Sequence, residues 1–143
     1  STRVRSSAAS DVYKRQLSSR GGLDVIVFGI GVNGHVALNE PGADPTLHAH
    51  VAQVAQVTAH VAQKYFEKKA PPLTMGVTIG LADALDAGSV WLVANTPAKR
   101  EAVEKLEALA GAGTPNNQVP ASLVAAMPQT ELLVTEAVYA PAS

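Results

Sequence analysis

The sequence predicts an α/β domain of Rossmann-like, three-layer form, with a mostly parallel, twisted sheet and helices on both faces. Three observations support this prediction. Short apolar, β-branched runs recur along the chain, stretches with helical periodicity lie between them, and a glycine-rich loop follows the first run. Strands that alternate with helices favour parallel pairing. Ligands of such sheets bind beyond the carboxyl ends of the strands, so the loops there are the first candidates for a site.

The first half of the chain begins with a strand over residues 24–30, an apolar run bounded by glycine that is typical of a buried parallel strand. A glycine-rich loop should then continue to Asp44. Residues 51–58 fit either a strand or a helix, and we favour a strand. A short helix is expected over residues 60–69, because two prolines follow it and would end it.

The second half continues the alternation. Residues 74–78 predict a brief extended segment, and residues 79–87 predict a helix that ends at a glycine. Residues 90–94 form a second continuous apolar run and therefore a second buried strand. A short helix over residues 121–126 and a last strand over residues 131–135 complete the pattern.

Between the last two strands, Thr96 can cap a helix with Pro97 at its first position. The helical periodicity of this segment predicts which side chains face the core. They are Ala102, Val103, Leu106 and Leu109.

Composition indicates an ordinary soluble domain. The 143 residues are 47% apolar and 16% charged, and the net charge of −1 gives no reason to expect nucleic acid or an anionic membrane as a partner. The chain has no Cys, which excludes disulfides and thiolate chemistry and fits a reducing cytoplasm. Its apolar runs fall short of the ~18 residues that cross a bilayer. We therefore expect a cytoplasmic protein.

Residues 1–20 differ from the rest. They contain six Ser and five Lys or Arg, without a periodicity that would bury one face. Residues 6–16 resemble sequence derived from a cloning adapter rather than from a gene. We expect residues 1–20 to be a non-native or disordered head, with residues 21–143 forming part of one α/β domain. A native surface helix or loop is the alternative.

The loop after the first strand fits the pattern G-x-G-x-x-G over residues 29–34. Dinucleotide binding requires a helix that opens at the third glycine and directs its N-terminus at the pyrophosphate. Asn39, Pro41 and Gly42 interrupt any such helix within two turns, and no acidic residue follows at the spacing needed for a ribose. We therefore expect no nucleotide cofactor.

The same loop fits a catalytic role better. Closely spaced glycines let the backbone approach a ligand and present its N–H groups, which makes Gly31 and Gly34 candidate substrate contacts. His35 can both give and take a proton near neutral pH. A carboxylate such as Glu40 can orient the imidazole and stabilise its charged form. From spacing alone, a His packed in a strand-to-loop turn is the alternative.

Residues 29–42, GIGVNGHVALNEPG, resemble the signature loop of glucosamine-6-phosphate deaminases, and the similarity extends over residues 21–138. The resemblance implies an enzyme that converts glucosamine 6-phosphate to fructose 6-phosphate and ammonia without a cofactor. It implies that His35 opens the sugar ring and that Glu40 partners it. Asn33 stands where the family often has Asp. Because Asn33 can only hydrogen-bond, the pKa of His35 should be less elevated than beside Asp.

The resemblance also implies phosphate contacts. A Lys at the place of Lys99 binds the substrate phosphate in that family, and Lys64 matches an Arg that contacts the same group. A solvated surface lysine is the alternative for Lys99. No metal site is expected, because the H-x-H pair His48 and His50 lacks a Cys or a convergent carboxylate.

Two family elements are expected before Asp24 and therefore outside this sequence. They are a Gly-Ser-Thr phosphate loop and an Asp that moves the proton between C1 and C2. The chain is thus expected to be the C-terminal half of the enzyme, N-terminally truncated and catalytically silent alone. Ala43, Asp44 and His50 replace the Ser and Arg through which allosteric members bind an activating sugar phosphate. Activation of that kind is not expected.

Three other functions stay open at this stage. The first is a galactosamine-6-phosphate enzyme, which residues 76–81 and 119–122 also resemble. The second is a 6-phosphogluconolactonase, whose loop usually continues differently after its Gly-His pair. The third is a non-catalytic regulator that binds sugar phosphate. The partner in each case is a small sugar phosphate, and the sequence does not decide whether the protein forms a homo-oligomer.

Overall fold

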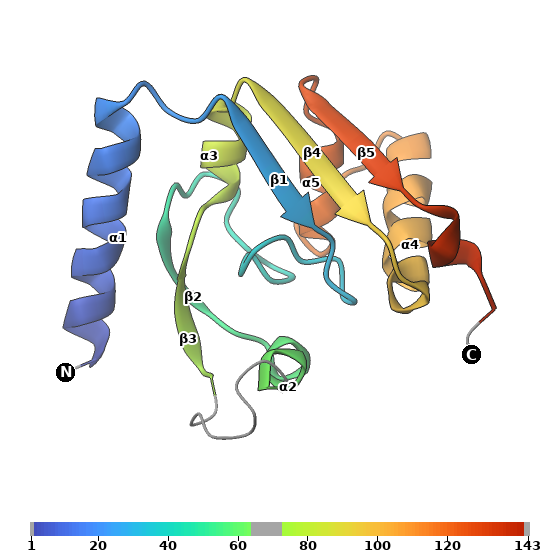
Figure 1. The fold of residues 1–143 in the computed structure, drawn as a ribbon, viewed down its shortest axis with the longest axis horizontal. Coiled ribbons are helices and arrows are strands. Elements are labelled where there is room, and N and C mark those ends of the chain that lie inside the picture. The colour runs from blue at the N-terminus through green and yellow to red at the C-terminus, as the bar shows by residue number, and fades with distance from the viewer. Residues whose placement is uncertain (1, 64–72, 142–143) are drawn as a thin grey trace.

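A computed structural model describes residues 2–63 and 73–141 (Figure 1). Helices and strands alternate along most of the chain. The elements in order are α1 (Thr2–Ser19), β1 (Val25–Gly29), β2 (His50–Gln53), α2 (Gln56–Gln63), β3 (Met75–Thr78), α3 (Leu81–Asp86), β4 (Ser89–Ala94), the 3-10 turn η2 (Pro97–Lys99), α4 (Arg100–Gly111), α5 (Pro120–Ala125), β5 (Thr130–Val134) and the 3-10 turn η3 (Glu136–Tyr139).

Two separate sheets organise the described residues. Strands β1, β4 and β5 form a parallel sheet in the order β1-β4-β5, with Val25 opposite Ser89 and Val90 opposite Thr130. Strands β2 and β3 pair antiparallel, with His50 opposite Thr78. The α/β class and the parallel sheet are therefore confirmed. The small antiparallel sheet uses the two segments whose extended structure was least certain from the sequence.

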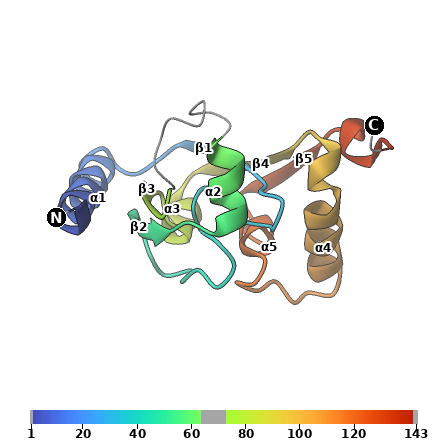
Figure 2. The same cartoon turned by 90° about the horizontal axis from the view of Figure 1, so that it is seen from below.

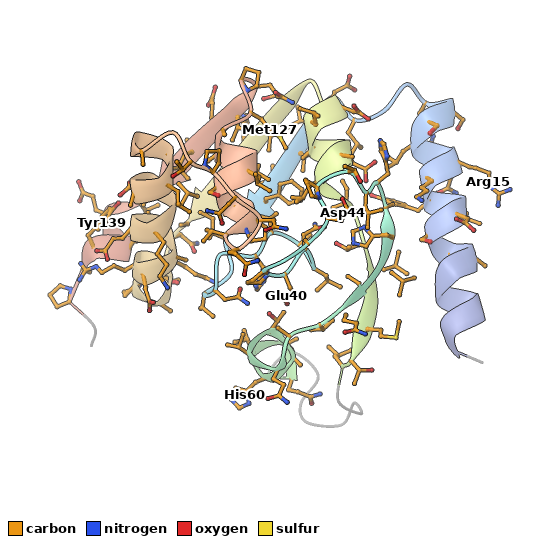
Figure 3. All side chains as sticks on the ribbon, turned by 180° about the vertical axis from the view of Figure 1, so that it is seen from behind. Arg15, Glu40, Asp44, His60, Met127 and Tyr139 are labelled. Atoms are coloured by element: carbon orange, nitrogen blue, oxygen red, sulfur yellow. The ribbon has the colours of Figure 1, made fainter. Side chains whose placement is uncertain are left out.

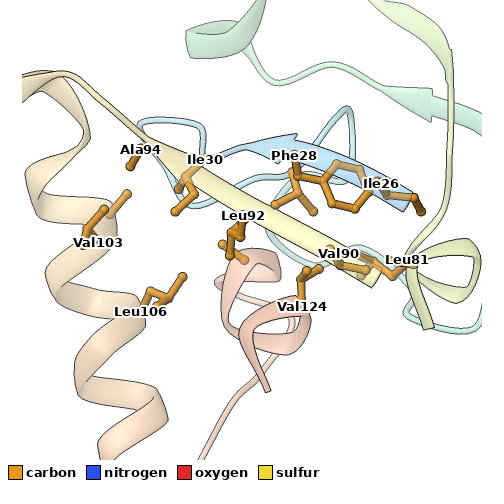
Figure 4. Packing of buried hydrophobic residues seen from close by; sticks show 14 of the residues in the cluster. Ile26, Phe28, Ile30, Leu81, Val90, Leu92, Ala94, Val103, Leu106 and Val124 are labelled. Carbon is orange, nitrogen blue, oxygen red and sulfur yellow. The ribbon is translucent and has the colours of Figure 1, made fainter. Parts of the chain in front are cut away.

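One face of the parallel sheet carries the core. Alternate residues of β1 and β4 point to this face, as the period of a strand requires, and they pack against α3, α4 and α5 (Figure 4). The largest of the side chains that are fully buried here are Ile30, Leu81, Leu92 and Leu106. Truncating such a side chain, as in Leu106→Ala, costs about 2–5 kcal/mol of the free energy of unfolding.

The opposite face of the parallel sheet is open in the described part of the chain. Helices α3, α4 and α5 all lie on one side of the strands (Figures 1 and 2). On the other side Val27 is 60% exposed and Trp91 is 42% exposed, and Val25 and Leu133 are exposed with them. The sequence predicted helices on both faces. The described residues supply one of these two layers, and they leave an apolar face of a kind that parallel sheets normally bury.

Residues 2–19 form a regular helix, α1, which lies beside β2 and β3 (Figure 1). This corrects the expectation that the segment lacks structure. No sequence pattern indicated this helix, because it has no apolar stripe: among its described side chains, only Ser10 is fully buried. Its Ala, Arg, Lys and Gln residues favour a helix by intrinsic propensity alone. The non-native origin of residues 1–20 stays a prediction.

Other differences concern boundaries. The strand predicted over residues 51–58 ends at Gln53, which pairs with Met75, the first residue of β3. Helix α2 begins at Gln56 and takes up the end of that segment. The predicted helix over residues 60–69 therefore starts earlier, and residues 64–69 lie outside the described residues. The remaining predicted elements are confirmed to within a few residues.

The predicted cap at Thr96 is only partly correct. Thr96 occupies the N-cap of η2, but its side chain makes no capping hydrogen bond there, and Pro97 opens η2 rather than α4. In α4, Ala102, Val103 and Leu106 are buried as predicted, whereas Leu109 is half-buried. Within the described ranges, no helix is both long and apolar enough to span a membrane.

Candidate active site

Two segments meet at the carboxyl edge of the parallel sheet. The loop over residues 29–42 leaves the end of β1, and η2, with Lys99 as its last residue, follows the end of β4. Because β1 and β4 are adjacent and parallel, these two ends lie side by side. This is the edge at which the sequence predicted a ligand site.

Gly31 and Gly34 allow the loop to fold tightly on itself. A Cβ atom at Gly31 would lie 2.1 Å from the His35 ring, and one at Gly34 would lie 2.8 Å from Cγ1 of Val119. Gly34 also has a φ of +83°, which favours glycine. The Gly31 N–H donates to the His35 carbonyl at 2.8 Å, and the Gly34 N–H donates to the Gly31 carbonyl at 3.0 Å. Both N–H groups are thus engaged within the loop. A contribution of Gly31 and Gly34 to substrate binding stays a prediction.

Asn33 joins the two expected catalytic side chains. Its Nδ2 donates to Oε2 of Glu40 at 2.8 Å, and its Oδ1 lies 2.6 Å from Nδ1 of His35. The direct distance between Nδ1 of His35 and Oε2 of Glu40 is longer, 3.6 Å. The His35 and Glu40 side chains are only 16% and 12% exposed. Asn33, His35 and Glu40, singled out from the sequence, are therefore brought together in one partly buried cluster.

The hydrogen bonds of Asn33 determine which nitrogen of His35 carries the proton. An ionised carboxylate only accepts hydrogen bonds, so the amide nitrogen of Asn33 must face Glu40 and the amide oxygen must face His35. The backbone N–H of His35 also donates to this oxygen, at 3.2 Å. Since the oxygen only accepts, the imidazole donates from Nδ1. In neutral His35, Nε2 is therefore the unprotonated nitrogen and can accept a proton.

The start of α2 contributes two contacts that the sequence did not reveal. The Ala55 N–H, immediately before α2, donates to Oε1 of Glu40 at 3.3 Å. The Thr58 hydroxyl lies 3.3 Å from Nδ1 of His35. Figure 3 shows Glu40 on the loop that faces α2, the helix that carries His60. Thr58 lay in the segment that fitted both strand and helix, so no periodicity marked it as a site residue.

The electrostatics of the cluster favour a neutral imidazole. Burial lowers the pKa of His35 below its ordinary 6.5; the negative charge of Glu40 opposes this shift and the positive charge of Lys99 adds to it. Burial also lowers the pKa of the Lys99 ammonium. Lys99 is half-buried, and its ammonium has no hydrogen-bond or ion-pair partner among the described residues. The cluster thus combines a neutral base with a nearby unpaired cation.

Glu40 also borders a cavity of about 380 Å³ between the loop and β2. Ala43 and His50 line this cavity, whereas His35 and Lys99 do not. Asp44 faces Thr46 instead, and hydrogen bonds from Thr46 lower its pKa. The cavity therefore adjoins the His35 cluster without containing its base.

The remaining candidate residues have other places. Lys64 lies outside the described residues. Nε2 of His48 lies 2.8 Å from Oδ2 of Asp86, and Nδ1 of His50 lies 2.7 Å from the His48 carbonyl oxygen. These two histidines are therefore held in separate local contacts rather than directed at a common point.

Comparison with known proteins identifies the family of the chain. The family described as glucosamine-6-phosphate isomerases/6-phosphogluconolactonase matches residues 2–134, a match that begins within the predicted head. The glucosamine-6-phosphate deaminase of Staphylococcus epidermidis is 35% identical over 133 residues, which cover 90% of this chain and 51% of that protein. The chain spans about half the length of the curated relatives it matches.

Solved structures give the same result for the fold. A monomeric glucosamine-6-phosphate deaminase superposes with a TM-score of 0.80 at 26% identity, over 92% of this chain and 53% of the other. The 6-phosphogluconolactonase from Trypanosoma cruzi shares the fold alone, with a TM-score of 0.67 at 14% identity, over 93% of this chain and 51% of the other. Since the family match covers most of the sequence, the chain belongs to the family of glucosamine-6-phosphate isomerases and 6-phosphogluconolactonases.

Proposed function

We propose that the full-length protein is an amino-sugar-phosphate deaminase/isomerase that converts glucosamine 6-phosphate to fructose 6-phosphate and ammonia. The observation that carries this proposal is the Glu40–Asn33–His35 cluster, in which one carboxylate and one amide fix a neutral imidazole at the carboxyl edge of the sheet. The deaminase name of the curated relatives supports the same reaction class.

His35 would open the sugar ring. Ring opening of a hexose removes a proton from the hydroxyl at C1, breaks the bond between C1 and the ring oxygen, and adds a proton to that oxygen. A single imidazole can do both transfers if its free nitrogen first accepts and then donates. Nε2 of His35 is that nitrogen, because Nδ1 donates to Asn33. The Glu40 charge stabilises the imidazolium that forms between the two transfers.

Lys99 would hold the substrate phosphate. Its ammonium is free of partners among the described residues, and a phosphate would supply the missing opposite charge. Lys64 would assist it, as the family resemblance implies, although a lysine lacks the bidentate geometry of arginine. The reaction needs neither metal nor nucleotide in this scheme. A cytoplasmic location belongs to the proposal, because a charged sugar phosphate does not cross a bilayer unaided.

A coupled assay of ammonia release tests the function. The polypeptide, extended to the length of its relatives, should release ammonia from glucosamine 6-phosphate, and galactosamine 6-phosphate tests the epimer at C4. Hydrolysis of 6-phosphogluconolactone without ammonia from either amino sugar would instead identify a lactonase. Binding of a sugar phosphate without any turnover would identify a regulator.

A further inference from the structure

Asn39, directly before Glu40 in the loop, has a buried side-chain amide that bonds to two backbone carbonyls. It is 1% exposed. Its Nδ2 donates to the Val36 carbonyl at 3.1 Å and to the Ile79 carbonyl at 2.9 Å. Its backbone N–H donates to the same Val36 carbonyl at 2.9 Å. The amide therefore closes a tight turn within the loop and ties that turn to the segment after β3.

A second bond fastens the neighbouring residue to the same place. The Leu38 N–H donates to the Thr78 hydroxyl at 3.1 Å, and that hydroxyl donates to the Ile79 carbonyl at 3.0 Å. Thr78 ends β3 and is buried. The two residues that precede Glu40 are thus joined to two residues about 40 positions further along the chain. We call Asn39 and Thr78 the loop anchor.

One atom of the anchor is unfavourably placed. Oδ1 of Asn39 is buried without a hydrogen-bond partner among the described residues. An apolar side chain would remove this unpartnered acceptor, but it would also take the amide donor away from the Val36 and Ile79 carbonyls. What only the amide provides is two N–H donors, which hold two carbonyls of irregular backbone at once. These two bonds of Asn39 hold the backbone directly before Glu40.

Glu40 is the next residue, and its carboxylate must meet Nδ2 of Asn33 at 2.8 Å for the cluster to form. Without the anchor, the Ala55 N–H would still donate to Oε1 of Glu40 and the Ala43 N–H to its carbonyl, but the two residues that precede Glu40 would lose their bonds to Thr78 and Ile79. We propose that Asn39, together with Thr78, is a positioning residue that fixes the Glu40 carboxylate against Asn33 and thereby sets the state of the His35 ring. The catalytic meaning of this role rests on the proposed function, but the positioning itself does not.

The test is the titration of His35 followed by long-range proton–nitrogen NMR in the full-length protein, with the signal assigned by its loss in His35→Gln. The Glu40 charge raises the pKa of His35, so Glu40→Gln should lower it further. Asn39→Ala should lower it in the same direction, because the carboxylate is released. In a Glu40→Gln background, Asn39→Ala should cause no additional fall, since its effect acts through Glu40.

Matched variants separate positioning from folding. Asn117→Ala removes another amide that donates to a carbonyl of this region, that of Ala43, and should leave the His35 titration unchanged. If Asn39→Ala does not fold, Thr78→Val removes the hydroxyl with little change of shape and should lower the pKa of His35. Thr78→Ser keeps the hydroxyl and should restore the wild-type value. With ammonia release as a second readout, Asn39→Ala should reduce kcat by up to roughly 10²-fold, with KM little changed.

Two results would overturn the proposal. One is an unchanged His35 titration in folded Asn39→Ala or Thr78→Val. The other is a shift of equal size in the presence and absence of Glu40. Absence of ammonia release by the wild-type protein would refute the proposed function and leave the titration result standing, so the two failures are distinguishable.

Discussion

The loop over residues 29–42 and the turn that carries Lys99 lie at the same edge of the sheet, but they are built in opposite ways. In the loop, the side chains of Asn33, His35 and Asn39 all have hydrogen-bond partners. The Lys99 ammonium has no such partner among the described residues. A group that transfers a proton must be held in one orientation, whereas a group that binds an anion must be left available. The difference supports our proposal, in which acid–base chemistry belongs to the loop and anion binding to the turn.

The largest effect should come from the loop. In the full-length protein, His35→Gln should lower kcat by roughly 10²–10⁴, the usual contribution of a positioned acid–base group. The substitution preserves much of the size of the side chain and removes the titrating nitrogen. Steady-state ammonia release measures it. A change in KM with kcat preserved would show that His35 binds rather than reacts.

The turn should respond differently. Lys99→Ala should raise KM by roughly 10- to 100-fold with kcat little changed, because one hydrogen bond to a charged group contributes about 1.5–3 kcal/mol and acts equally in the ground and transition states. Lys105→Ala, in α4, is the matched control, because Lys105 is exposed and paired with Glu101. A fall in kcat with KM unchanged would contradict the division between loop and turn.

The two segments also act on the same imidazole with opposite sign. The Glu40 charge raises the pKa of His35 and the Lys99 charge lowers it, so Glu40→Gln should lower that pKa and Lys99→Gln should raise it. The wild-type pKa lies below the ordinary 6.5, which means that the ring stays neutral, and able to accept a proton, to a lower pH. NMR titration of the three proteins checks this order. Equal directions for the two variants would rule it out.

The smallest effect concerns the backbone of the loop. Ala37, between His35 and Glu40, has a φ of +50°, and no other non-glycine residue in the described ranges has a positive φ. Ala37→Gly relieves the strain of this conformation, whereas the greater freedom of glycine in the unfolded chain opposes the gain. The free energy of unfolding should therefore rise by about 0.5–1 kcal/mol in total. Ala43→Gly, directly after the loop and at a residue without a positive φ, should lower the free energy of unfolding. Urea unfolding compares them, and equal losses would show that the loop is not strained at Ala37.

Local pattern was enough to predict the strands of the parallel sheet and to single out the residues of the loop. The runs over residues 24–30, 90–94 and 131–135 became β1, β4 and β5, because a short apolar, β-branched segment between turns is itself the signal for a buried strand. His35 and Glu40 were identified because they lie in one short motif. Because these two residues are only five positions apart, they stay close in space in most conformations of the loop.

Tertiary structure decided everything that depends on distant residues. The partners of Asn39 and Leu38 lie about 40 positions away, and Thr58 reaches His35 across 23 positions, so no local pattern records these contacts. Gly34 depends on a distant residue in the same way, because a Cβ atom there would meet Cγ1 of Val119. The sequence identified the groups to which we assign the chemistry. Contacts within the folded loop determined which nitrogen of His35 is free, and bonds to distant segments hold the turn that precedes Glu40.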